Sequence, residues 1–114
     1  MRYTTAMTMN RDNIMDLVDK IHKTKFIVWD INKLGYNDIS YELNHVDRMC
    51  ADSANFLLGK NSLTGMDMIV LDHVLDSIQN SCYEISKKIP EELRDELKAS
   101  LLMIREVFSM DRSY

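Results

Sequence analysis

The chain has 114 residues, a formal net charge of −4 and an apolar content of 46%. Three residues are Gly and one is Pro, about 3.5% of the chain, where an average soluble protein has roughly 12%. A β-sandwich or barrel needs a turn roughly every 8–12 residues and uses these residue types there. The composition therefore excludes such folds, and the mild acidity argues against a general nucleic-acid binder, which carries a basic face.

Residues 1–10 contain no apolar core of the kind a signal peptide needs, so they predict a flexible N-terminal arm. Residues 11–114 are expected to form a single helical-bundle domain, because one core suits a chain of this length. Uninterrupted apolar runs reach four residues, as at positions 26–29, which is far too short to cross a membrane. We therefore expect a protein of the cytoplasm with no membrane partner.

Four segments repeat apolar residues every three or four positions, which is the pattern of a helix with one buried face. We expect these helices at about residues 11–34, 39–58, 65–88 and 90–110. Helices of this length joined by short links favour antiparallel neighbours. The expected fold is therefore an all-α, antiparallel four-helix bundle that associates as a homodimer. The alternative is one bundle built from the long hairpins of two chains.

Most of these segments begin and end at residues that favour helix ends. The expected N-caps are Asn10, Asp38 and Thr64, and the expected stops are Gly35 and Gly59. Asp67 completes a capping box at the third helix. Pro90 is expected at the first position of the last helix. Because Ile89 is almost the whole link before it, the last two helices are expected to form a tight hairpin.

The main apolar stripe of each helix is expected to form the core. Its members are Ile14, Leu17, Val18, Ile21, Val28, Ile31, Ile39, Leu43, Val46, Cys50, Ala54, Leu57, Leu71, Val74, Leu75, Ile78, Cys82, Ile85, Leu93, Leu97, Leu101, Ile104 and Phe108. Cys50 and Cys82 lie on these stripes, which predicts two buried reduced thiols and fits a reducing cytoplasm. A Cys50–Cys82 disulfide is the alternative.

A second set of apolar residues is left over once this core is assigned. It comprises Met15, Phe26, Trp29, Met49, Phe56, Met66, Ile69, Val70, Met103, Val107 and Met110. Three explanations stay open: wide buried arcs on each helix, a homo-oligomer interface, or a surface for another protein. Trp, Phe and Met are residue types enriched at protein interfaces.

We therefore hypothesise one protein-binding surface. Its residues are His22, Lys25, Phe26, Trp29, Met49 and Phe56. The expected function is that of a small non-enzymatic protein that binds another protein, as regulators, inhibitors, immunity proteins and chaperones do, and that also forms a homo-oligomer. The abundance of Asp, Asn, Ile, Ser and Met would suit an A/T-rich bacterial or phage genome.

The histidines do not predict a metal site. Metal ligands in a helical bundle converge on its axis, whereas His45 and His73 project away from their core stripes. The three glycines are isolated, so no phosphate-binding loop is predicted. We accordingly expect no metal, no cofactor and no catalytic residue.

Two alternative functions remain. Phosphotransfer bundles use an exposed histidine midway along a helix, as His73 is expected to be, but Asp76 would repel the phosphoryl group. A nucleic-acid-associated regulator is the other, although no short basic recognition helix stands out. The basic residues within positions 20–25 are expected to form a solvated face that complements the acidic second helix.

Overall fold

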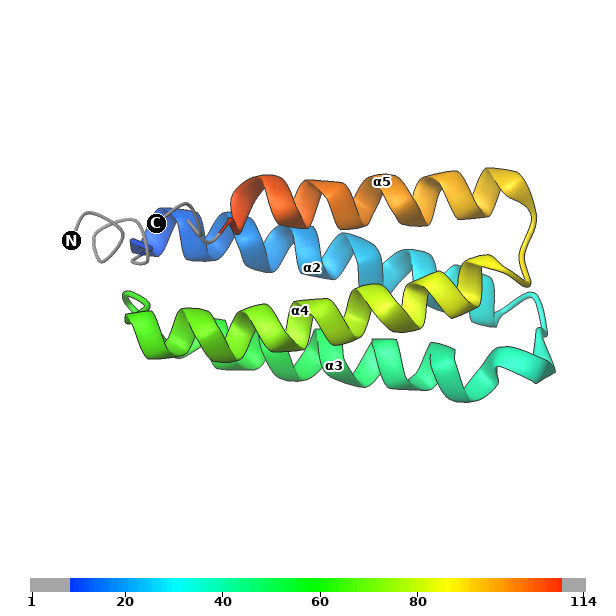
Figure 1. Cartoon of the computed structure of the whole chain (residues 1–114), viewed down its shortest axis with the longest axis horizontal. Coiled ribbons are helices and arrows are strands. Elements are labelled where there is room, and N and C mark those ends of the chain that lie inside the picture. Colours follow the sequence, from blue (N-terminus) through cyan, green and yellow to red (C-terminus); the bar gives the residue numbers. More distant parts are fainter. Residues whose placement is uncertain (1–8, 110–114) are drawn as a thin grey trace.

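The computed structural model describes residues 9–109, which fold into four α-helices and one 3-10 turn (Figure 1). The elements are α2 (Arg11–Asn32), η1 (Asn37–Ile39), α3 (Ser40–Leu58), α4 (Gly65–Ser86) and α5 (Glu91–Val107). The helices run alternately in opposite directions, with α2 and α4 each packed against both α3 and α5 (Figure 1). The predicted all-α antiparallel four-helix bundle is confirmed, and a single chain completes it.

The helix ends agree with the prediction to within a few residues, but two of the predicted caps are wrong. Asn10 caps α2 by accepting the Asn13 N–H at 2.9 Å, as predicted. Asp38 does not cap α3, because η1 leads directly into that helix and the Asn37 carbonyl accepts the Ser40 N–H. Pro90 is the N-cap of α5 rather than its first helical residue, since its ψ of 157° is extended.

Two further end signals of the sequence are confirmed. Thr64 and Asp67 form the predicted capping box, in which each side chain accepts the other residue's backbone N–H. The Thr64 backbone N–H lowers the pKa of the Asp67 carboxyl. Gly35 has a φ of +82° and provides the predicted left-handed stop after α2, whereas α3 ends at Gly59 with a φ of −83°.

The core contains nearly all of the predicted stripe residues. Val74, Leu93 and Leu101 are half-buried, and the others are buried. Within residues 9–109, the structure adds four apolar residues that the periodicity did not assign, namely Met9, Leu63, Met68 and Ile89.

Met9 lies outside the helices and differs most from its expected role. The sequence predicts it to belong to the flexible arm, yet its side chain is buried and its carbonyl accepts the Leu63 N–H at 3.2 Å. Residues 1–8 of the expected arm lie outside the described residues.

Arg11 joins the start of α2 to the end of α3. Its guanidinium donates to the Leu58 carbonyl at 3.2 Å and to the Lys60 carbonyl at 2.6 Å. Carbonyl groups in the last turn of a helix have no backbone N–H partner within that helix, so an arginine nearby can supply the missing hydrogen-bond donor. Within residues 9–109, no helix combines the length and the apolar character that crossing a bilayer requires.

The contact between α4 and α5 is the sparsest among neighbouring helices, which corrects the expectation of a tight hairpin. The link between them is residues 87–90, which is longer than the near-single residue, Ile89, that the sequence predicts. The facing flanks, however, carry long or polar side chains: Asp72, Gln79 and Ser86 on α4, and Arg94, Lys98 and Arg105 on α5. Such side chains do not interdigitate in the way that apolar residues do, so the two helices stay apart.

Arg105 makes the ion pairs that join these two helices. It donates to Asp72 Oδ1 at 2.9 Å and to Asp76 Oδ1 at 2.5 Å. Asp72 is buried, and Asp76 is more than half exposed.

Replacing Arg105 with Met is expected to lower the free energy of unfolding by about 2 kcal/mol, because the buried Asp72 carboxylate loses a charged hydrogen-bond donor. Asp76→Asn should cost less than about 1 kcal/mol, because an exposed ion pair contributes little. Urea unfolding of both variants measures the difference. A Met variant as stable as the wild type would contradict this role of Arg105.

Candidate protein-binding surfaces

Four of the six predicted site residues lie together on one flank of α2. We call His22, Lys25, Phe26 and Trp29 the aromatic cluster. Their spacing of three and four residues places them side by side on the helix surface. The Phe26 and Trp29 rings meet edge to face, with centroids 5.6 Å apart, and the His22 ring lies 6.3 Å from Phe26. Phe26 is 53% exposed and Trp29 is 43% exposed.

Trp29 is held in place by residues of two helices. Its Nε1 donates to Asp47 Oδ1 of α3 at 2.5 Å. On α2, the Lys25 ammonium lies 4.8 Å from the centre of the indole ring, within the range of a cation–π interaction. These two contacts orient the ring while leaving much of its surface exposed to solvent.

Met49 and Phe56 lie on a different surface. They line a shallow hollow of about 180 Å³ together with Val70 and Val74 of α4, and we call these four residues the α3–α4 patch. Asp47, which holds Trp29, and Met49 are about 200° apart around α3 by helix geometry. The aromatic cluster and the α3–α4 patch therefore lie on opposite flanks of α3, and the six residues do not form one continuous surface.

The remaining second-stripe residues divide between surface and core. Met15, Met66, Ile69 and Val70 are exposed. Met103 and Val107 are half-buried, and Val107 packs against the core. Met110 lies outside the described residues. Partial burial thus accounts for Met103 and Val107 on α5, but not for the exposed residues of α2 and α4.

The histidines are spread over three helices. His73 is exposed on α4, and the nearby Asp76 is bonded to Arg105. His45 stacks on Tyr41 with centroids 6.0 Å apart. Among residues 9–109, no three His, Cys, Asp or Glu side chains are grouped closely enough to hold a metal ion.

The two cysteines are buried and unbridged, as predicted. Burial raises the pKa of both the Cys50 and the Cys82 thiol to about 12. At neutral pH both are therefore protonated, and a protonated thiol is a poor nucleophile.

The basic residues near the middle of α2 pair mainly within their own helix. Lys20 contacts Asp16 at 3.2 Å and Asp19 at 3.7 Å. The hydrogen bond with Asp16 is the main reason that the pKa of Lys20 is raised. Lys20 therefore pairs within α2 and not, as predicted, with the acidic residues of α3. Lys25 lies over the Trp29 ring.

The chain matches no protein-family model, and no curated protein or solved structure is significantly similar to it. The aromatic cluster and the α3–α4 patch, of which Met49 and Val74 are half-buried, differ in how well their aromatic rings are held. Phe56 has one cation–π contact, with the Lys60 ammonium 5.1 Å from the ring centre, whereas Trp29 has a hydrogen bond, a cation–π contact and a neighbouring ring. The aromatic cluster is therefore the better ordered of the two.

Proposed function

We propose that this protein acts by binding another protein through the aromatic cluster of α2. The proposal is carried by one observation: Trp29 is exposed to solvent and yet fixed by Asp47 and Lys25. Trp is among the residue types that most often dominate the free energy of protein association. A ring that is already oriented also loses little conformational entropy when a partner covers it.

The surroundings of the cluster fit the usual arrangement of an interface. Exposed rings at the centre of a binding site are normally surrounded by polar groups that remain hydrated. Here the Lys25 ammonium and the Asp47 carboxylate lie beside the rings. A partner that inserts an apolar side chain against Phe26 and Trp29 would keep both charges at the edge. Such binding suits a regulator, an inhibitor, an immunity protein or a chaperone.

Trp29→Ala is expected to weaken association at least tenfold, because truncation of a central aromatic residue typically costs about 2 kcal/mol of binding free energy. Sedimentation velocity over a concentration series measures self-association. Affinity capture from an extract of the source organism, with wild type and variant compared side by side, measures binding to other proteins. Tyr41→Ala is the matched control, because Tyr41 is an exposed aromatic residue outside the cluster and should leave both unchanged.

Phe56→Ala separates the two apolar surfaces. Loss of binding in this variant, with Trp29→Ala unaffected, would assign the interface to the α3–α4 patch and overturn the proposal. If Trp29→Ala lowers the helical circular dichroism signal, Phe26→Ala repeats the test, because the Phe26 ring is 53% exposed and has no hydrogen-bonding group to lose. Normal binding by a folded Phe26→Ala/Lys25→Ala variant would also contradict the proposal.

A further inference from the structure

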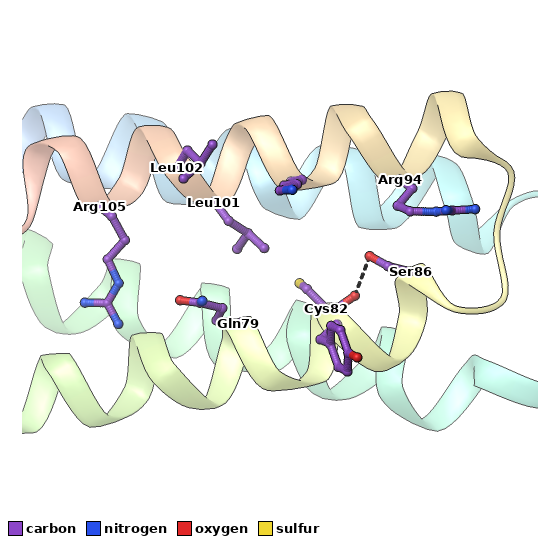
Figure 2. A pocket seen from close by; sticks show the side chains of 9 residues that line it. Gln79, Cys82, Ser86, Arg94, Leu101, Leu102 and Arg105 are labelled. Atoms are coloured by element: carbon purple, nitrogen blue, oxygen red, sulfur yellow. Dashed lines mark hydrogen bonds between the residues drawn. The ribbon is translucent and has the colours of Figure 1, made fainter.

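A groove of about 350 Å³ opens between α4 and α5, where the bundle is packed least closely (Figure 2). It lies on the far side of the bundle from the aromatic cluster, because α4 and α5 bound it while the cluster projects between α2 and α3. Its volume is at the low end of the range for small-molecule sites, roughly 300–1,000 Å³. The groove is therefore large enough for a small ligand and independent of the proposed protein-binding surface.

The middle of the groove is apolar. Cys82 is fully buried at its base, and Leu101 is half-buried and points into the space between the helices (Figure 2). Leu102, which is 58% exposed, lines the groove from the same helix. The Cys82 thiol adds no charge, because burial keeps it protonated. This part of the groove favours a ligand with a hydrocarbon body.

The charged residues of the lining are all cationic, although the whole chain is acidic. Arg94, Lys98 and Arg105 line the groove, whereas no Asp or Glu does so. Arg105 closes one end of it and is neutralised by Asp72 and Asp76. The positive charge that can attract a ligand in this groove therefore comes from Arg94 and Lys98.

The positive charges of Arg94 and Lys98 are not neutralised by an ion pair in the described part of the chain. They are four residues apart on α5, so two like charges face the same side of that helix, which is mildly destabilising. Neither forms an ion pair with any residue in the described part of the chain, although Glu91 and Asp95 each precede one of them by three positions. Within residues 9–109, the one hydrogen bond made by either side chain joins the Arg94 guanidinium to the Ile89 carbonyl at 3.4 Å.

We propose that this groove binds a small amphipathic carboxylate, with its head at Arg94 and Lys98 and its hydrocarbon chain along Cys82, Leu101 and Leu102. An arginine fork and a lysine ammonium are the donors that carboxylates bind most strongly. Leu101 and Leu102 lie between Arg94 and Arg105 along α5 (Figure 2), so a linear ligand would extend along the groove. At roughly 30 Å³ for each water-sized group, the volume takes about twelve such groups.

Octanoate, 1-octanol and acetate test the head and the chain of the ligand separately. Titrated into the full-length protein labelled with ¹⁵N, octanoate should shift amide resonances of residues 79–86 and 94–105 in a saturable manner. A ligand of about ten non-hydrogen atoms is expected to have a dissociation constant on the order of 0.1–1 mM. Octanol should bind about tenfold more weakly, and acetate should give no saturable shift.

Lys98→Gln should weaken octanoate binding about tenfold and leave octanol binding unchanged, because it removes one charge-assisted hydrogen bond. Lys23→Gln is the matched control: it removes one charge from an exposed lysine of α2 and should change neither ligand. Leu102→Ala should weaken both ligands alike. Both Leu102 and Lys98 are exposed, so the fold should be retained, which circular dichroism checks.

Three outcomes would overturn the proposal. The first is equal affinity of the wild type for octanoate and octanol, which removes the role of the cations. The second is equal weakening by Lys98→Gln and Lys23→Gln, which would indicate non-specific attraction. The third is the lack of a saturable shift of the groove amides at millimolar octanoate, whether no amide shifts or the shifted amides lie around Phe26 and Trp29.

Discussion

Phe108→Ala is expected to lower the free energy of unfolding by about 3–5 kcal/mol. The ring is fully buried just beyond the end of α5, at the end of the bundle where α2 begins and where the α3–α4 link lies (Figure 1). Its truncation removes apolar burial and leaves a cavity. Backbone hydrogen bonds, such as that from the Phe108 N–H to the Ile104 carbonyl at 2.8 Å, hold the chain in place, so the cavity cannot collapse fully. Urea unfolding measures the loss.

This loss is a large share of the total stability of a single domain, which is roughly 5–15 kcal/mol. The melting temperature should accordingly fall by more than about 10 °C. Tyr41→Ala provides the control, because a side chain that is 76% exposed should change stability by less than about 0.5 kcal/mol. A loss below about 1 kcal/mol in Phe108→Ala would show that this end of the bundle does not depend on the ring.

A rise from about pH 8 to about pH 10 is expected to lower the free energy of unfolding by about 3 kcal/mol through the two buried thiols. Burial, with a smaller contribution from Asp47 at Cys50, raises the pKa of each thiol from 9.0 to about 12. Above about pH 9 the unfolded thiols lose their protons while the folded ones retain them. The stabilisation is therefore complete below pH 9 and decreases as the pH rises towards 12.

Comparison of the wild type with Cys50→Ala/Cys82→Ala isolates this effect, because other groups that titrate in the same range are common to both proteins. The double variant should be less stable at pH 8 but should lose about 3 kcal/mol less between pH 8 and pH 10. The single variants should each show half of that difference. An equal loss in the wild type and the double variant would contradict the burial of the thiols.

Helix periodicity was sufficient to predict most of the bundle. The residues of α2 and α3 that repeat every three or four positions are buried, because a long helix with one apolar side is stable only when that side is covered. The prediction was weaker where a local signal competed with a tertiary contact. Asp38 is a good N-cap residue, yet η1 takes the chain into α3 and leaves its side chain without that role.

Contacts across long sequence separations could not be predicted in the same way. Met9 looked like part of a polar arm, but its pairing with Leu63 buries it. Arg11 bonds to carbonyl groups nearly fifty residues away, at Leu58 and Lys60. The Thr24 hydroxyl, buried in α2, donates to Ser100 Oγ of α5 at 2.9 Å. Each depends on which elements meet in space, and the sequence pattern of one segment does not contain that information.

The candidate sites show the same distinction. The exposure of Phe26, Trp29 and Phe56 was expected from their angular distance to the core stripes, and it is observed. The prediction that they form a single surface was wrong. Phe26 and Trp29 lie where α2 packs against one flank of α3, whereas Phe56 lies on the other flank, beside α4. The sequence contains the cationic line on α5, Arg94, Lys98 and Arg105, at a spacing of four and seven residues, but the pattern of one helix does not indicate that these residues line a groove.

By itself, the sequence determined four helices, their approximate ends and the side of each that is buried, because these follow from local geometry and from the burial of apolar residues. Only the tertiary structure decided which flanks face each other. It separated the aromatic cluster from the α3–α4 patch, and it placed a polar flank of α4 opposite the cations of α5, so that these two helices remain apart and a groove lies between them. The pattern of one helix specifies which of its own faces is buried, whereas a groove is formed by the facing sides of two helices.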